Sequence, residues 1–254
     1  MTSPRERPRF RRGAAILPSL FTTGNLFLGF WAIVKTFHGE YAEAAPFILW
    51  AIVLDVFDGQ IARLTGTASE FGGELDSLAD VISFGVAPAL LAYAWGFSTV
   101  RHVGWLAAFL FVVCGALRLA RFNVQRGAID GRYFVGLPIP AAAAQVATIV
   151  QFLPDPLDER SEALIGVVLL VTLAFLMVST FRYWSLKKVD LRRRQSYITV
   201  LGIALLVVLI ASHPKWVLLA MATLYWLSGP AVYAISLLRR RGAASPAVVA
   251  RESH

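Results

Sequence analysis

Four aspartates in an otherwise apolar part of the chain have the type and spacing of a metal site. Asp55 and Asp58 are three residues apart, and Asp76 and Asp80 are four apart. Side chains three or four residues apart lie on the same face of a helix, so each pair presents two carboxylates together. The segment between the pairs contains the glycine-rich stretch LTGTASEFGG and is short. It therefore allows the two pairs to face each other.

Carboxylates that share one place repel each other unless cations lie among them. Oxygen ligands of this kind suit Mg²⁺ or Mn²⁺, and four aspartates match the charge of two divalent cations. Two metal ions ~3.5–4 Å apart are a known device for phosphoryl displacement. The alternative is that the aspartates form ordinary ion pairs with Arg63 and neighbouring arginines. The spacing of all four favours the metal site.

The residues around the aspartates suit a phosphate group. Gly59 directly follows Asp58, where a side chain would block a ligand from the metals. Gly72 lets the backbone approach a ligand closely, and a helix that begins there favours an anion at its N-terminus. Arg63 offers a guanidinium fork to phosphate oxygens, and Ser69 offers a hydroxyl.

The elements that must position these residues are membrane helices. The chain has 254 residues, of which 57% are hydrophobic and 16% charged, whereas soluble domains carry about 25% charged residues. The apolar residues form runs of about 20, the length that crosses ~30 Å of hydrocarbon. We therefore predict an all-α, polytopic transmembrane bundle. Its eight expected spans are residues 16–37, 41–62, 74–97, 103–122, 135–153, 163–184, 196–212 and 215–238. In the third of them, Gly85 and Pro88 are expected to kink the helix.

The distribution of basic residues predicts the orientation. With the N-terminus inside, all of the 24 lysines and arginines fall on the inner side except Lys35, Arg101, Arg160 and Lys215. Cytoplasmic loops of membrane proteins collect such residues. We expect both termini and the aspartates on the cytoplasmic side of the cell (inner) membrane. The net charge of +8 then reflects topology and does not indicate a nucleic-acid partner.

The pattern D-x2-D-G-x2-A-R-x8-G-x3-D-x3-D, from Asp55 to Asp80, resembles that of the CDP-alcohol phosphatidyltransferases. The resemblance implies a homodimer with a six-helix core, to which the seventh and eighth spans are an addition. It implies two divalent cations, Mg²⁺ or Mn²⁺, bound by the four aspartates, with Asp80 as the general base. It also implies that a CDP-diacylglycerol donor contacts Gly59, Arg63, Ser69 and Gly72.

Other stretches resemble the branch of this family that uses serine. They are LPSLFTTGNLFLGF (17–30), ELDSLADVISFGVAPA (74–89), LRLARFN (117–123) and FVGLPIPAAAA (134–144). Ser19 departs from the asparagine expected after the proline. Thr22 and Asn25 are further candidates for the donor site, and hydrogen bonding between helices is the alternative for both.

The acceptor site is expected at the inner end of the fourth span. Arg118 and Arg121 are three residues apart there, and an arginine pair suits the carboxylate of serine. Asn123 would orient the same ligand, and Gly136 would shape the pocket wall where the fifth span begins. The alternative for the arginines is the usual inner-side charge of a membrane protein.

The resemblance, together with these residues, implies a transfer of the phosphatidyl group from CDP-diacylglycerol to L-serine, with release of CMP. The nearest alternative is the same chemistry on glycerol 3-phosphate, inositol phosphate or choline. An alternative of another class is a cation transporter, which predicts ionisable residues across the membrane midplane. The expected organisation is a basic tail (1–13), a catalytic membrane domain (14–190), a transmembrane hairpin (191–241) and a second tail (242–254).

Overall fold

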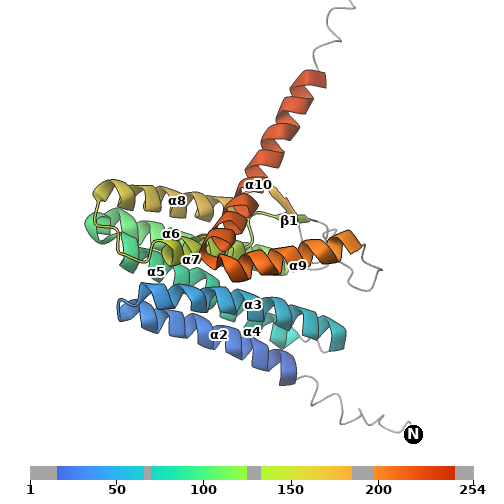
Figure 1. The fold of residues 1–254 in the computed structure, drawn as a ribbon, viewed down its shortest axis with the longest axis horizontal. Helices are drawn as coiled ribbons and strands as arrows, with labels where there is room; N and C mark the ends of the chain where they lie inside the picture. The colour runs from blue at the N-terminus through green and yellow to red at the C-terminus, as the bar shows by residue number, and fades with distance from the viewer. Residues whose placement is uncertain (1–15, 66–69, 125–132, 185–196, 244–254) are drawn as a thin grey trace, which may run out of the picture.

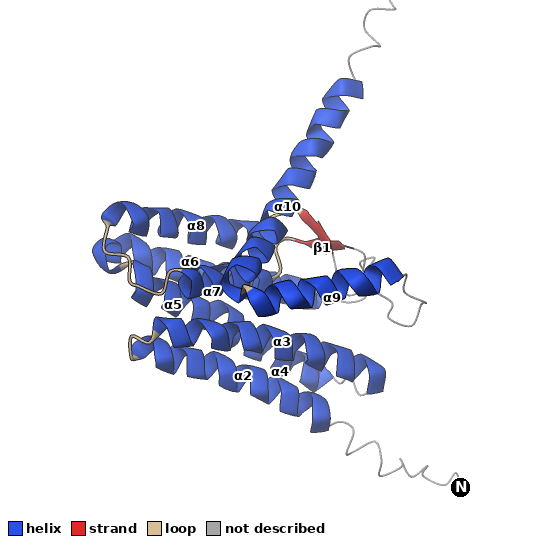
Figure 2. Cartoon of the chain, in the orientation of Figure 1, coloured by secondary structure: helices blue, strands red, loops and turns tan. Residues whose placement is uncertain are grey.

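A computed structural model describes residues 16–65, 70–124, 133–184 and 197–243, nearly all of them helical (Figure 2). Both predicted tails, apart from Gly242 and Ala243, lie outside the described residues, as does the start of the catalytic domain. The helices are α2 (Ile16–Phe37), α3 (Tyr41–Thr65), α4 (Glu70–Asp80), η1 (Val81–Val86), α5 (Ala87–Gly96), η2 (Ser98–Val100), α6 (Arg101–Val124), α7 (Ile139–Phe152), α8 (Arg160–Val178), α9 (Tyr197–Ser212) and α10 (Pro214–Ala243).

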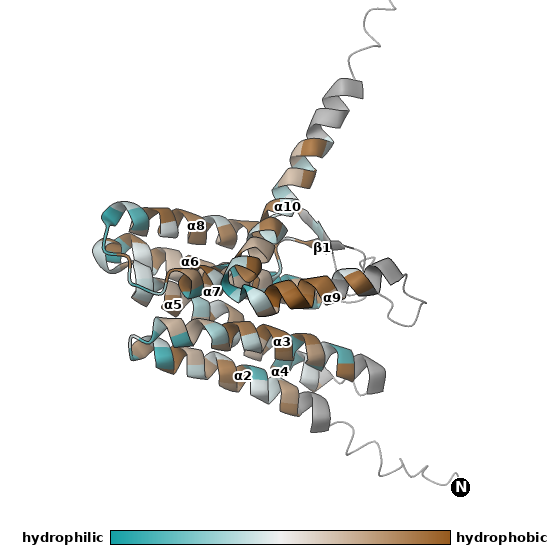
Figure 3. Ribbon diagram, viewed as in Figure 1, coloured by the Kyte–Doolittle hydropathy of each residue, from teal (hydrophilic) through white to brown (hydrophobic). Residues whose placement is uncertain are grey.

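The predicted polytopic helical membrane protein is confirmed. Within the described residues, six helical stretches are long and apolar enough to span a membrane: Leu20–Phe37, Tyr41–Ile61, Phe71–Gly96, Ser98–Val124, Arg160–Val178 and Pro214–Ser236. Apolar residues cover these helices along most of their length (Figure 3). Helices also form at the fifth and seventh predicted spans, but α7 has 14 residues and α9 has 16. At 1.5 Å per residue they are shorter than the ~30 Å hydrocarbon layer.

A short pair of strands limits two of the expected spans. The strands β1 (Tyr133–Val135) and β2 (Arg182–Trp184) pair antiparallel, so α7 begins later and α8 ends earlier than the sequence predicted. Gly136 makes the turn from β1 toward α7 with a φ of 82°. Its amide donates to the carbonyl of Phe181 at 2.8 Å, and a Cβ there would lie 2.3 Å from the carbonyl oxygen of Met177. Only glycine fits such a position without strain.

The third span changes its helical type immediately after Asp80. The segment η1 is a π-helix, and Pro88 lies in the first turn of the following α5. Short π-helical turns occur often at functional sites. The Ser83 hydroxyl in η1 donates to the carbonyl of Asn25 at 3.0 Å, and a Cβ on Gly29 would overlap Ser83. The close approach of α2 to η1 thus fixes the helix that carries Asp80.

The helices alternate in direction through the bundle (Figure 1). As a result, the end of α3 and the start of α4 lie at the end of the bundle where β1 and β2 pair. The helix pairs α2–α3 and α6–α8 pack along their lengths, and α7 packs between α3 and α10. From the turn at His213, α9 and α10 diverge, and α10 crosses the other helices steeply (Figure 1).

Candidate functional site

Three of the four aspartates, one from α3 and two from α4, bring their carboxylates together. Oxygens of the carboxylates of Asp55, Asp76 and Asp80 all lie within 4.8 Å of one another. Asp80 is buried, with 8% of its surface exposed, whereas Asp55 and Asp76 are half-buried. The spacing of four residues on α4 puts Asp76 and Asp80 on one face, as expected for a helix. The structure therefore places carboxylates from two helices close to one another.

The fourth aspartate lies outside this group. Asp58 on α3 is buried, with 5% of its surface exposed, and its carboxylate accepts a short hydrogen bond from the Thr22 hydroxyl on α2. Thr22 thus forms a hydrogen bond between two helices, which was the alternative role expected for it from the sequence. The binding of a metal ion by Asp58 stays a prediction, as does the contact of Thr22 with the CDP-diacylglycerol donor.

Asn25 connects α2 to the group of three carboxylates. Its side-chain amide nitrogen lies 3.4 Å from a carboxylate oxygen of Asp80. Only 1% of its surface is exposed, and its side-chain oxygen has no hydrogen-bond partner among the described residues. Buried polar atoms are nearly always satisfied, and an amide oxygen beside carboxylates is a ligand that hard cations accept.

Arg118 supplies positive charge from α6. It is buried, with 9% of its surface exposed, and it interacts electrostatically with Asp80 and Asp55. One guanidinium does not neutralise three clustered carboxylates, so an excess of negative charge remains in the described part of the site. The clustered carboxylates and the amide oxygen of Asn25 are the kind of oxygen ligands that divalent cations prefer. The alternative partner, Arg63, lies in α3, but its side chain is outside the described residues.

The other acceptor candidates lie on the last turns of α6. The Asn123 amide donates to the Ser77 hydroxyl at 2.9 Å, and Ser77 donates to the carbonyl of Gly73 at 2.9 Å. Asn123 therefore ties α6 to the turn of α4 that lies between Asp76 and Asp80. Arg121 is half-buried. Sequence reasoning missed Ser77, and its place between two aspartates was the only signal for it.

The candidates for the donor site are only partly described. Gly59 is exposed, and a Cβ added to it would meet no described atom within 4 Å. Gly72 is half-buried in the first turn of α4. Ser69 lies outside the described residues. The glycine at 59 is thus not required by packing within the described chain.

Comparison with known proteins places the described bundle in a family. The family model described as CDP-alcohol phosphatidyltransferase matches residues 15–179, which include α2 to α8. The matched segment contains the four aspartates and the residues of the predicted acceptor site.

Three relatives span most of the same segment. A CDP-diacylglycerol–serine O-phosphatidyltransferase of Helicobacter pylori is 42% identical over 180 residues, and the comparison covers 68% of this chain and 74% of that protein. The Bacillus subtilis protein of the same name is 35% identical over 172 residues, 68% of this chain and 92% of that protein. An archaetidylserine synthase of Methanothermobacter thermautotrophicus is 39% identical over 169 residues, 66% of this chain and 69% of that protein.

Proposed function

Since the chain belongs to the CDP-alcohol phosphatidyltransferase family, we propose that it transfers the phosphatidyl group of CDP-diacylglycerol to the hydroxyl of L-serine and releases CMP. The observation that carries the proposal is the cluster of Asp55, Asp76 and Asp80 beside the buried Arg118. Relatives named for the serine reaction at 35–42% identity support the choice of acceptor.

Two divalent cations, Mg²⁺ or Mn²⁺, would be held by Asp55, Asp76 and Asp80, with Asp58 as the fourth carboxylate. The excess of negative charge supports this assignment, and so does the side-chain oxygen of Asn25, which has no hydrogen-bond partner in the described part of the chain. When bound, such cations neutralise a diphosphate and the negative charge that develops on its leaving group.

The protein's own residues would bind, orient and deprotonate the substrates. Asp80 accepts the proton of the serine hydroxyl, whose oxygen forms a bond to the lipid-linked phosphorus as the bond to the CMP oxygen breaks. Positioning and electrostatic stabilisation dominate such a transfer. Arg118 and Arg121 would bind the serine carboxylate with its fixed geometry, and Asn123 would orient it. The donor would contact Gly59, Arg63, Ser69, Gly72, Thr22 and Asn25.

The position of the site agrees with a reaction at the membrane surface. The aspartates and arginines gather near the ends of α3 and α6. The basic residues of the sequence are concentrated in the segments expected on the same side of the membrane. We propose that this side faces the cytoplasm, that the protein lies in the cell (inner) membrane with its lipids, and that it works as a homodimer.

An assay of CMP release with purified protein tests the function. With CDP-diacylglycerol and Mg²⁺ or Mn²⁺, we expect release with L-serine and none with glycerol 3-phosphate, inositol phosphate or choline. Faster release with any of these would assign the protein to another acceptor. Cation flux into liposomes without CMP release would favour the transporter alternative.

Gly59 provides a test of the donor site. We expect Gly59→Ala to lower CMP release at least tenfold, because the added methyl group would occupy space next to the diphosphate. The free energy of unfolding of the variant should stay the same or rise by up to ~1 kcal/mol, since alanine is a better helix former than glycine. The matched control is Gly202→Ala in α9, where a Cβ also meets no described atom within 4 Å. Full activity of Gly59→Ala, measured beside its melting temperature, would remove Gly59 from the donor site.

A further inference from the structure

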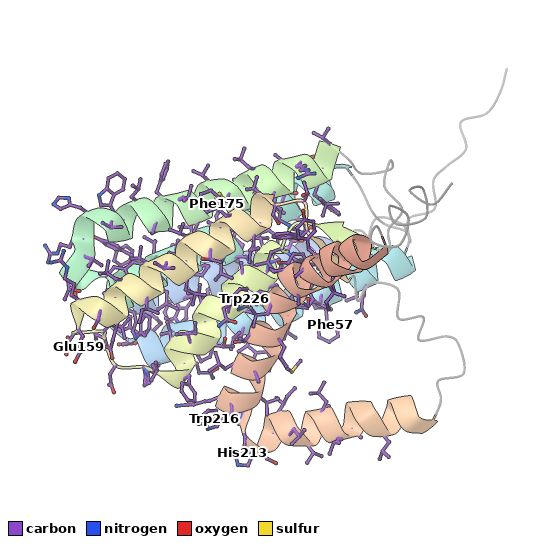
Figure 4. The ribbon with its side chains drawn as sticks, turned by 90° about the horizontal axis from the view of Figure 1, so that it is seen from above. Phe57, Glu159, Phe175, His213, Trp216 and Trp226 are labelled. Atoms are coloured by element: carbon purple, nitrogen blue, oxygen red, sulfur yellow. The ribbon has the colours of Figure 1, made fainter. Side chains whose placement is uncertain are left out.

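Two consecutive hydrogen bonds hold the side chain of Asn123 against α4. The Ser77 hydroxyl donates to the carbonyl of Gly73, four residues earlier on α4, at 2.9 Å. The same hydroxyl accepts from the side-chain nitrogen of Asn123 on α6, also at 2.9 Å. In Figure 4, α6 (green) ends on the same side of the bundle as Phe57 of α3, away from Glu159. The two bonds therefore lie at the end of the bundle that carries the aspartates.

The bond from Ser77 to Gly73 determines which end of the Asn123 amide faces α4. A hydroxyl has one hydrogen to donate and lone pairs that accept. Because the hydrogen of Ser77 is directed to the carbonyl of Gly73, its oxygen is left to accept. It can pair with the amide nitrogen of Asn123, which donates, but not with the amide oxygen, which only accepts. The side-chain oxygen of Asn123 is therefore turned away from Ser77.

The side-chain oxygen of Asn123 is a buried acceptor to which no described residue donates a hydrogen bond. Buried acceptors are nearly always paired, and an unpaired one costs free energy. Ser77, which orients this amide, lies three residues before Asp80 and thus on the same face of α4. The carboxylates of Asp55, Asp76 and Asp80 lie there within 4.8 Å of one another. Their negative charge favours a donor that is itself positively charged.

We propose that the side-chain oxygen of Asn123 accepts a hydrogen bond from the ammonium group of the acceptor, and that Ser77 positions it for this contact. The inference rests on the function proposed above and deepens it, because it assigns the selection of an amino alcohol to one oxygen atom. L-serine has a cationic group with N–H donors. The quaternary ammonium of choline has no N–H, and glycerol 3-phosphate and inositol phosphate are anions. Asn123 is thus a binding residue and Ser77 a positioning residue.

Comparison of L-serine with 3-hydroxypropanoate tests the proposal, because the second compound has the same hydroxyl and carboxylate but no ammonium group. Its affinity is measured as a Ki in competition with L-serine. In the wild type we expect this Ki to exceed the KM for L-serine at least about tenfold, the effect of a lost hydrogen bond to a charged group. Ser77→Ala removes the acceptor that orients Asn123. It should raise the KM for L-serine about tenfold and leave the Ki, the kcat and the KM for CDP-diacylglycerol within about twofold.

Ser212→Ala in α9 is the matched control. The hydroxyl of Ser212 also donates to a carbonyl four residues earlier, that of Val208, at 2.8 Å, and Ser212 is exposed. This control should keep the KM for L-serine. Asn123→Leu is a second test variant, since it removes the amide itself and should raise the same KM at least as much as Ser77→Ala. Adding Ser77→Ala to Asn123→Leu should then change nothing further, because residues that act through one another are not additive.

Two results would overturn the proposal. One is an unchanged KM for L-serine in Ser77→Ala and Asn123→Leu. The other is an equal rise in that KM and in the Ki of 3-hydroxypropanoate, which would mean that the substitutions distort the site as a whole. A failure of the proposed function would appear in the wild type instead, as CMP release with another alcohol and none with L-serine.

Discussion

Replacing Asp80 with asparagine should abolish CMP release and leave a folded protein. General acid–base catalysis contributes about 10²–10⁴-fold to a rate, and Asp80 is also one of the three clustered carboxylates. We therefore expect a loss of at least about 10³-fold in kcat. Asparagine has the same shape, and its side-chain oxygen can still accept from Asn25, which lies 3.4 Å from Asp80. We therefore expect the loss of activity to come from the missing base and carboxylate, and not from misfolding.

Asp158→Asn is the control for this experiment, because Asp158 is an exposed residue in the loop that precedes α8. It should keep wild-type activity. The melting temperature of Asp80→Asn without divalent cations should equal or exceed that of the wild type, since one charge leaves a group of like charges. Incorporation of labelled serine within tenfold of the wild type would refute the role of Asp80.

Removal of divalent cations should have the second large effect. A chelator should stop CMP release, and Mn²⁺ or Mg²⁺ should restore it. A ligand at 100 times its Kd stabilises a folded protein by ~2.7 kcal/mol, which for a chain of this size is a rise of about 5–10 °C in melting temperature. We expect a shift of this order when Mn²⁺ is added to the metal-free protein.

Asp76→Asn separates specific binding from a general effect of the cation. It removes one carboxylate of the cluster, so its melting temperature should rise much less with Mn²⁺, while Asp158→Asn should respond as the wild type does. Equal shifts in all three proteins would mean that the cation acts elsewhere on the surface. Full activity in the presence of excess chelator would exclude metal dependence altogether.

The sequence predicted the parts of the site that depend on local periodicity. Asp76 and Asp80 share a face because a helix repeats every 3.6 residues, and hydrophobic runs located the helices to within a few residues. Periodicity does not determine how two helices are rotated relative to each other. For that reason it did not indicate that Asp58 would accept from Thr22 while Asp55 joins Asp76 and Asp80.

Contacts between distant segments also could not be predicted from the sequence. The pairing of β1 with β2 depends on residues about 50 positions apart, and strands of three residues carry no detectable alternation. The bond from Asn123 to Ser77 spans 46 positions.

The π-helix after Asp80 changes how the two halves of this span are rotated relative to each other. A π-turn holds an extra residue compared with an α-turn, and each residue corresponds to about 100° of rotation. The segment η1 therefore changes the angular register between α4, which presents Asp76 and Asp80, and α5, which packs among apolar neighbours. The carboxylates of α4 and the apolar face of α5 are thus rotated relative to each other by an angle that an uninterrupted α-helix would not give.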